Sequence, residues 1–330
     1  MPSHSPHPAG TPPTPATLSA LSPAETAAAL PYPELAQSVA RVLANPAVRV
    51  PPRLVQPLPG GGSLFVMPAH DERIAITKLI TFVAGNAARG LPTIQGDIVV
   101  FDVTTGQRLC LMDGPTVTAR RTAAVSLLAA QRLASAAARQ GPLLVVGAGV
   151  QGRSHLEAFR AGLGVQEVWV ASRSPQSAQG LAAYARTLGM TAHTTIDPDA
   201  ALAHCPLVVS ATPAQAVVLR ADPRPDAFVA AVGAFTPRMV EWDAPVLQRL
   251  VQHGRVVVDT RDADHEAGDL ILAGFDVAGF PALADVPEPI VTSGPVFFKS
   301  CGWAGWDLAA ARLMVEPPPL TRTVAPTLAG

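Results

Sequence analysis

Lysine is almost absent from this sequence, so the two lysines that remain are candidates for chemistry. Only Lys78 and Lys299 are lysines among the 24 basic residues. A lysine ammonium is a compact charge whose pKa shifts readily on burial, whereas a guanidinium stays charged. Lys78 lies within the apolar run RIAITKLITFV, where a buried ammonium is costly unless it meets an anion. We therefore expect Lys78 to face a ligand.

Further cations and a hydroxyl lie in the same part of the chain. Arg53 follows a double proline, and Thr93 follows a Leu-Pro pair. Arg120 and Arg121 lie side by side near the start of an expected long helix. Adjacent residues of a helix point in different directions, so only one of the two can face a cleft. We expect the other arginine to be solvated.

The stretch GPLLVVGAGVQGRSHLEAF, residues 141–159, contains a motif for a cofactor. An apolar run leads into the spacing G-x-G-x-x-G, and an amphipathic helix follows at once. In such a turn the first glycine permits the tight bend, the second lets the backbone approach a pyrophosphate, and the third lets the helix pack on the strand. Gly147, Gly149 and Gly152 hold these places, which predicts a dinucleotide site. The other loop residues of this predicted site are Ala148, Val150 and Gln151.

The end of the next predicted strand indicates which nicotinamide cofactor binds. An NAD enzyme usually places an acid there, about 20 residues beyond the loop, to hold the ribose 2′-hydroxyl. This sequence has Ala171, Ser172 and Arg173 instead. Serine and arginine can bind and neutralise a 2′-phosphate that an acid would repel, although Arg173 could also be an ordinary solvated arginine. We expect NADPH, with NADH possible. The remaining predicted cofactor contacts are Ser174, Thr212, Val232 and Gly302.

Length and composition favour a globular, two-domain enzyme that acts on small molecules. The 330 residues exceed the size at which one core usually stops growing. A formal net charge of −1 provides no basic field for nucleic acid or anionic lipid. No apolar run approaches a membrane span and no signal peptide is apparent, so we expect a cytoplasmic protein. Cys110, Cys205 and Cys301 lack metal-ligand spacing and are expected to be reduced thiols without a metal.

The order of predicted elements indicates two different folds. A helix interrupted near Pro31 and Pro33 is followed by short runs that predict a largely antiparallel sheet. A long helix, about 116–139, leads out of it. Strands then alternate with helices, which predicts a doubly wound parallel (Rossmann) sheet, so the fold class is α/β with a second α+β domain for substrate binding and dimerisation. The predicted strands are 143–147, 167–171, 191–195, 206–211, 227–233 and 255–259, and the predicted helices between them are 150–161, 175–188, 198–203 and 243–252.

The expected domains follow from these elements. Residues 1–20, rich in Pro, Ser and Thr, form a disordered tail, and 21–139 form the substrate-binding and dimerisation domain. Residues 140–298 form the cofactor-binding domain. The tail FFKSCGWAGWDLAAARLMVE reads as helical, and we expect residues 299–330 to return to the first domain as a C-terminal helix.

Several stretches resemble the ornithine cyclodeaminase/mu-crystallin family over about residues 30 to 315. They include AITKLITFVAGNAARGLPTIQGDIVVFDVTTG, DGPTVTARRTAAVSLLAA, GAGVQGRSHLEAF, EAGDL and FFKSCGWAGWDLAAA. The resemblance implies that Arg121, directly before TAA, binds a substrate carboxylate. It adds Arg53 and Lys78 around that carboxylate, with Thr93 close by. Three cations around one small anion fit a 2-carboxylate substrate.

One loop separates the activities within that family. The family's cyclodeaminases carry an aspartate after the fifth strand of the cofactor domain, whereas this loop reads VGAFTPRMVEW, with Ala234, Phe235 and Thr236. The pattern is similar to that of the family's reductase and alanine dehydrogenase branch. It implies NAD(P)H-dependent reduction of the cyclic imino acids Δ1-pyrroline-2-carboxylate and Δ1-piperideine-2-carboxylate to L-proline and L-pipecolate. Lys78 is then the candidate proton donor to the imine. Alanine dehydrogenase, ornithine cyclodeaminase and a mu-crystallin-like ligand-binding protein remain alternatives.

Two further expectations concern histidines and assembly. His155, in the helix behind the glycine loop, is expected to pack rather than react, and His70 and His265 are expected to be loop residues without a catalytic role. The apolar strands and the Ala/Leu-rich face of residues 122–138, together with the resemblance, predict a homodimer.

Overall fold

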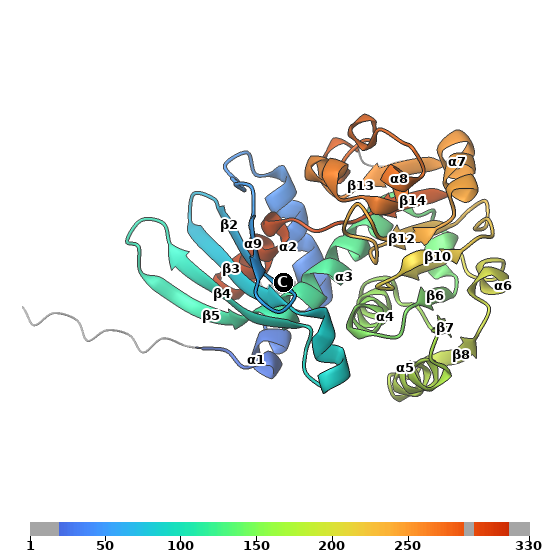
Figure 1. Cartoon of the computed structure of the whole chain (residues 1–330), viewed down its shortest axis with the longest axis horizontal. Helices are drawn as coiled ribbons and strands as arrows, with labels where there is room; N and C mark the ends of the chain where they lie inside the picture. The colour runs from blue at the N-terminus through green and yellow to red at the C-terminus, as the bar shows by residue number, and fades with distance from the viewer. Residues whose placement is uncertain (1–19, 287–293, 317–330) are drawn as a thin grey trace, which may run out of the picture.

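The computed structural model describes residues 20–286 and 294–316, and two separate sheets dominate it (Figure 1). The predicted disordered tail lies outside the described residues, except for Ala20. Figure 1 shows the antiparallel sheet with its helices on the left and the parallel sheet on the right. The mixed α/β architecture predicted from the sequence is confirmed.

The first sheet is antiparallel and has the order β1-β2-β3-β4-β5. Alternation along β3 buries Ile76, Lys78 and Ile80 and exposes Leu79. Lys78 therefore points to the face on which α3 and α9 pack. The strands are β1 (Leu54–Leu58), β2 (Gly62–His70), β3 (Ile74–Phe82), β4 (Ile94–Asp102) and β5 (Arg108–Asp113). The helices are α1 (Pro23–Ala28), α2 (Tyr32–Ala44), α3 (Gly114–Leu133) and α9 (Ala304–Val315).

Helix boundaries on this side follow the prolines and caps in part. The break expected near Pro31 separates α1 from α2. The predicted end of the long helix at residue 139 is wrong, because α3 ends at Leu133 and Ala134 is extended, with ψ 141°. Ser135 Oγ then accepts a hydrogen bond from Ala138 N at 3.0 Å and starts a separate 3₁₀ turn.

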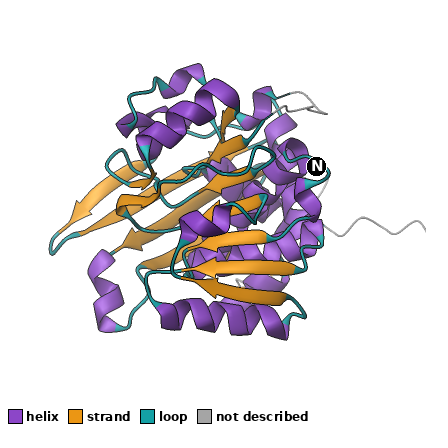
Figure 2. Cartoon of the chain, turned by 90° about the vertical axis from the view of Figure 1, so that its right-hand side faces the viewer, coloured by secondary structure: helices purple, strands orange, loops and turns teal. Residues whose placement is uncertain are grey.

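The second sheet is entirely parallel, with the order β13-β14-β11-β9-β6-β7-β8. Figure 2 shows helices on both sides of the strands. The order reverses between β6 and β9, which is where ligands bind in such sheets, beyond the carboxyl ends of the strands. The strands are β6 (Leu143–Val146), β7 (Glu167–Ala171), β8 (Thr191–Thr195), β9 (Leu207–Ser210), β11 (Phe228–Ala231), β13 (Arg255–Val258) and β14 (Val296–Lys299). The helices are α4 (Val150–Leu163), α5 (Pro175–Thr187), α6 (Pro198–Leu202), α7 (Ala244–His253) and α8 (Gly268–Leu272). A small parallel pair, β10 (Gln215–Leu219) and β12 (Val240–Trp242), lies beside it.

The predicted all-helical tail is wrong at its start. Val296–Lys299 forms β14, which lies between β11 and β13 with every side chain buried. A short apolar run fits a buried strand as well as a helix, and periodicity alone does not separate the two. Gly302, at φ +95°, turns the chain before α9 begins. Residues 300–303 therefore carry the chain from the parallel sheet to the antiparallel half.

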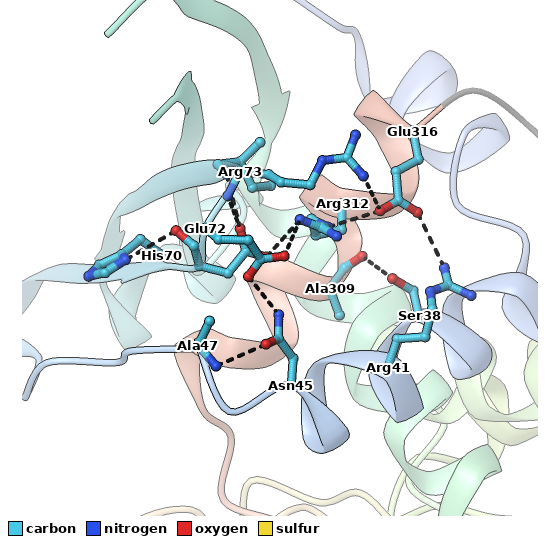
Figure 3. A network of polar contacts seen from close by, with 12 residues as sticks. Ser38, Arg41, Asn45, Ala47, His70, Glu72, Arg73, Ala309, Arg312 and Glu316 are labelled. Carbon is cyan, nitrogen blue, oxygen red and sulfur yellow. Dashed lines mark hydrogen bonds and ion pairs between the residues drawn. The ribbon is translucent and has the colours of Figure 1, made fainter. Parts of the chain in front are cut away.

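Helix α9 is held on the antiparallel half by a polar network at its C-terminal end (Figure 3). Arg312 forms ion pairs with Asp71 at 3.0 Å and with Glu316 at 2.9 Å. Ser38 Oγ in α2 donates a hydrogen bond to the Ala309 carbonyl at 2.8 Å. The helix also contacts β2 and β3, so it spans the covered face of the sheet that carries Lys78.

Candidate active site

Three charged side chains from distant parts of the chain meet beneath the antiparallel sheet. Lys78 Nζ on β3 lies 3.3 and 3.2 Å from the two carboxylate oxygens of Asp307 on α9. Arg121 Nε on α3 donates to the same carboxylate at 3.3 Å. Lys78, Arg121 and Asp307 are 1, 6 and 0% exposed, so this cluster lies inside the protein.

The pKa of Lys78 lies closer to neutral pH than that of a lysine exposed to water. Burial lowers its pKa to about 8; Asp307 opposes the shift, and the charges of Arg121 and Arg53 add to it. A lysine with such a pKa exchanges its proton near neutral pH, which suits a general acid.

Gly302 places backbone directly against the Arg121 guanidinium. A Cβ at Gly302 would lie 3.1 and 3.2 Å from the two terminal nitrogens of Arg121, and its φ of +95° favours glycine. The buried Asp259 Oδ2 holds the loop by accepting from Ser300 Oγ at 2.8 Å and from the Cys301 and Gly302 amides at 3.1 and 2.9 Å. Gly302, expected among the cofactor contacts, thus lies beside the carboxylate-binding candidate Arg121.

Arg53 lies at the edge of this cluster and is already paired. Its guanidinium forms an ion pair with Glu266, which precedes α8 in the parallel half. Within the cluster itself, Lys78 and Arg121 share the single carboxylate of Asp307, so the contacts among these three side chains leave one excess positive charge. Such an excess in a partly desolvated site favours a single bound anion.

Thr93 is the predicted substrate contact that the structure does not join to the cluster. It lies in the turn before β4, where its carbonyl accepts a hydrogen bond from Val83 N at 2.9 Å. Among the described residues, no hydrogen bond links its side chain to Lys78 or Arg121.

The sequence prediction missed Asp307 and Glu266 and misplaced Arg120. Arg120 was expected to be solvated, but its guanidinium carbon lies 3.9 Å from the centre of the Tyr32 ring, and its Nε donates to the Leu30 carbonyl at 2.7 Å. An aspartate within the otherwise apolar stretch WAGWDLAAA was the available sign of a buried partner, because a lone buried carboxylate is costly.

The glycine loop has the geometry that a pyrophosphate needs. Gly147 has φ +112°, and a Cβ at Gly152 would lie 1.9 Å from the Gly147 carbonyl oxygen. A Cβ at Gly149 would meet nothing within 4 Å, so the backbone there borders open space. The first turn of α4 carries no acid, which leaves its N–H groups to a phosphate. Gln151 Oε1 is buried without a hydrogen-bond partner among the described residues.

The end of β7 presents an exposed arginine. Within residues 20–286 and 294–316, no ion pair or hydrogen bond involves the side chain of Arg173. Ser172 Oγ accepts from the Ser174 amide at 3.3 Å, and Ser174 Oγ caps α5 by accepting from Ser177 N at 3.2 Å. The Ser174 hydroxyl therefore serves the helix, whereas Ser172 and Arg173 remain candidates for contact with a 2′-phosphate.

Thr212 and Val232, the other predicted cofactor contacts, follow β9 and β11 at the same edge of the sheet. The Thr212 amide and hydroxyl both donate to Glu241, at 2.7 and 2.9 Å. The Val232 amide donates to the Ser210 carbonyl at 2.8 Å. The two loops therefore lie together beyond the carboxyl ends of neighbouring strands, and the loop after Val232 carries Ala234 and no carboxylate before Glu241.

The histidines lie outside the charged cluster. His155 is buried, with its ring nitrogens 2.8 Å from the Gln151 carbonyl and 2.9 Å from Ser126 Oγ, and burial lowers its pKa to about 4. It packs α4 on α3, as expected. His70 ends β2 rather than lying in a loop, and His265 lies in a short 3₁₀ turn; both are exposed.

Other functional groups are not found in the described part of the chain. Within residues 20–286 and 294–316, no group of histidine, cysteine or carboxylate side chains is arranged to hold a metal ion. The same residues contain no helix long and apolar enough to cross a membrane. Cys110, Cys205 and Cys301 are free thiols, as expected.

Known proteins resemble the chain over most of its length. Delta(1)-pyrroline-2-carboxylate reductase 2 of Burkholderia ambifaria is 42% identical over 295 residues, which cover 88% of this chain and 92% of that protein. Delta(1)-pyrroline-2-carboxylate/Delta(1)-piperideine-2-carboxylate reductase of Azospirillum brasilense is 40% identical over 306 residues, covering 89% and 96%. An archaeal alanine dehydrogenase dimer with bound NAD shares the fold, with a TM-score of 0.80 and 24% identity over 90% of this chain and 94% of that one. The sequence model of the ornithine cyclodeaminase/mu-crystallin family matches residues 30–316, and the chain belongs to this family.

Proposed function

We propose that this protein reduces cyclic ketimines that carry a 2-carboxylate, with NADPH as hydride donor and NADH as a weaker substitute. The leading substrates are Δ1-pyrroline-2-carboxylate and Δ1-piperideine-2-carboxylate, which would give L-proline and L-pipecolate. The observation that carries the proposal is the buried cluster of Lys78, Arg121 and Asp307, in which two cations share one carboxylate. The names of the Burkholderia and Azospirillum relatives support this substrate class.

The substrate carboxylate is assigned to the arginines. Arg121 contacts Asp307 through Nε, and its terminal nitrogens lie beside Gly302, which has no side chain to occupy the space between them. A planar guanidinium binds a carboxylate through parallel hydrogen bonds and so fixes its orientation. Arg53, which now pairs with Glu266, is the second candidate and would share its charge between the two carboxylates.

We assign Lys78 the role of proton donor to the imine nitrogen. Hydride adds most readily to a protonated C=N bond, and bound NADPH would supply that hydride to C2. Lys78 Nζ donates its proton to the imine nitrogen, so the product gains one hydride and one proton while the amine of Lys78 becomes neutral. Asp307 holds the ammonium in place before transfer, and a pKa of about 8 makes the transfer inexpensive.

In this proposal, the antiparallel half binds the substrate and the parallel half binds the cofactor. Residues 21–139 together with α9 bind the imino acid, and the parallel sheet binds the cofactor, with the glycine loop on the pyrophosphate and Ser172 and Arg173 on the 2′-phosphate. The open space over Gly149 and the unpaired state of Arg173 among the described residues support the assignment.

A homodimer is also proposed, through the uncovered face of the antiparallel sheet. Leu54 and Leu79, which lie on the same face of the sheet on either side of Val66, are 57 and 47% exposed, and paired apolar side chains exposed on a sheet face are typical of an interaction surface. The expected contribution of the α3 face is wrong, because its apolar residues are already buried within the chain. Light scattering at micromolar concentration should give twice the 34.1 kDa of one chain, and Leu79→Arg should shift it toward the monomer. A wild-type protein that scatters as a monomer would remove this part of the proposal.

The experiment that tests the activity compares three reactions of the purified protein. NADPH oxidation is followed with Δ1-pyrroline-2-carboxylate and with pyruvate plus ammonia, and NAD⁺-dependent proline formation from L-ornithine is measured separately. We expect rapid oxidation with the cyclic imine and L-proline as the product. Faster turnover of pyruvate plus ammonia would instead favour an alanine dehydrogenase, and proline from ornithine a cyclodeaminase.

A further inference from the structure

A second buried charge cluster lies in the parallel half and contains the other lysine. Lys299 Nζ at the end of β14 donates to Asp269 Oδ2 at 2.8 Å, and neither side chain is more than 1% exposed. The other oxygen of Asp269 accepts the backbone amides of Glu241 and Trp242, at 2.6 and 3.1 Å. The ion pair therefore fixes the backbone of β12 at Glu241.

The Glu241 carboxylate reaches from there to two strand ends. Oε1 accepts the amide and the hydroxyl of Thr212, directly beyond β9, at 2.7 and 2.9 Å. Oε2 accepts the amide of Gly233, beyond β11, at 2.9 Å and Ser210 Oγ at 3.0 Å. A Cβ at Gly233 would lie 2.3 Å from the Thr212 carbonyl and 2.4 Å from Glu241 Oε1, so the two loops are in close contact.

Burying these charged side chains costs free energy of desolvation, so the arrangement is not explained by stability alone. Three ionisable side chains, Lys299, Asp269 and Glu241, are fully buried, and apolar residues of similar volume would often be as stable. Four donors converge on Glu241 and fill the acceptor positions of its carboxylate; these hydrogen bonds and Lys299 oppose the rise in its pKa that burial and Asp269 cause. What the charges specify, and apolar packing would not, is the direction of the backbone at Thr212 and Gly233.

The strand order indicates which half of the dinucleotide would lie against the backbone of Thr212 and Gly233. In a doubly wound sheet the dinucleotide crosses the switch point, with its halves over opposite sides of the sheet. The proposed 2′-phosphate contacts, Ser172 and Arg173, follow β7 and therefore place the adenosine half on that side. The ends of β9 and β11 are then left to the nicotinamide half.

We propose that Glu241 is a positioning residue for the nicotinamide end of the cofactor, and that the Lys299–Asp269 ion pair holds Glu241 in place. This inference rests on the proposed cofactor. Glu241 acts by setting the Thr212 and Gly233 loops, whose backbone contacts the nicotinamide half, and not by touching the reacting atoms.

The test compares two ligands that differ in the nicotinamide half. Calorimetry measures the dissociation constants of NADPH and of 2′-phospho-ADP-ribose, which lacks nicotinamide, in the wild type and in Glu241→Gln. Hydrogen bonds to a charged group are worth about tenfold or more in affinity, so NADPH should bind about tenfold more weakly to the variant while the fragment changes less than about twofold. Ser210→Ala, which removes one donor to Glu241, should give a smaller loss in the same direction.

The matched control is Glu157→Gln, which changes another glutamate that accepts several hydrogen bonds, from Tyr32, Tyr184 and Arg153. It lies on α4 behind the glycine loop, so it should leave the ratio of the two affinities unchanged. A ratio that also stays unchanged in Glu241→Gln and Ser210→Ala, or an equal loss of both ligands, would overturn the positioning role. The ratio of the two affinities is measured without an imine. If Glu241→Gln changes this ratio as expected and the wild type reduces no imine, only the proposed substrate is contradicted.

Discussion

The two lysines of this chain are both buried on strands and paired with an aspartate, yet their surroundings carry opposite charge. Lys78 shares Asp307 with Arg121, and Arg53 lies near, so cations are in excess. Lys299 meets Asp269 with Glu241 close behind it, so carboxylates are in excess.

That difference is the reason for proposing that a ligand binds at the Lys78 cluster, whereas the charges around Lys299 are already paired within the protein. Burial and neighbouring arginines lower the pKa of Lys78 to about 8, which leaves a proton to give and a charge for an anion to balance. Burial also acts to lower the pKa of Lys299, but Asp269 and Glu241 outweigh it and the pKa is raised. We therefore propose the same residue type as a proton donor in one cluster and as a fixed counter-ion in the other.

The largest expected effect comes from removing the ammonium of Lys78. Lys78→Met should lower kcat for Δ1-pyrroline-2-carboxylate by about 10²- to 10⁴-fold, the usual contribution of a general acid. The Tm should change little, because Asp307 keeps its contact with Arg121. Steady-state kinetics and a thermal melt check both parts, and a variant that retains more than half of the wild-type kcat would contradict the role.

The same change in the other cluster serves as the comparison. Lys299→Met leaves Asp269 and Glu241 buried without a cation, so the free energy of unfolding should fall by about 3–5 kcal/mol. Urea denaturation measures it. Equal losses of stability in Lys78→Met and Lys299→Met would erase the distinction between the clusters.

A pair of adjacent arginines gives the next test. Arg121→Ala should lower kcat/KM for the imine by about ten- to a hundredfold through loss of a charge-assisted bond, while KM for NADPH changes little. Arg120→Ala is the control, because Arg120 stacks on Tyr32 outside the cluster and should affect the Tm instead. A lower kcat/KM for the imine in Arg120→Ala and an unchanged one in Arg121→Ala would show that Arg120, and not Arg121, binds the substrate carboxylate.

A smaller effect is expected outside both clusters, at the end of β7. Arg173→Ala should reduce kcat/KM with NADPH by about tenfold, at the low end for a charge-assisted bond, and leave NADH almost unaffected. Ser172→Asp should favour NADH, since a carboxylate repels the 2′-phosphate. Both cofactors are measured at saturating imine and fixed ionic strength. A wild type that prefers NADH would show that this strand end does not bind the phosphate.

Features that depend on neighbouring residues could be predicted from the sequence. Features that depend on contacts between distant residues could not. The glycine loop and the alternation that buries Lys78 depend on neighbouring residues, so they were visible in the sequence. Asp307 lies 229 residues from Lys78, and no local pattern pairs them. The tail from Phe297 is predicted as helix because a short apolar run fits both structures, and only the pairing with β11 and β13 makes Val296–Lys299 a strand.

The central claim is that Lys78 donates the proton from a cluster tuned by Asp307, and the pH dependence of kcat/KM for imine reduction tests it most directly. A lysine that must be protonated loses activity as the pH rises through its pKa, so the wild type should decline above about pH 8. Asp307 supports the charged form, so Asp307→Asn should move this decline to lower pH. The substrate's own titration is the same in both proteins and does not affect the shift between them. A decline at the same pH in both proteins, or none between pH values of about 6 and 10, would contradict the account.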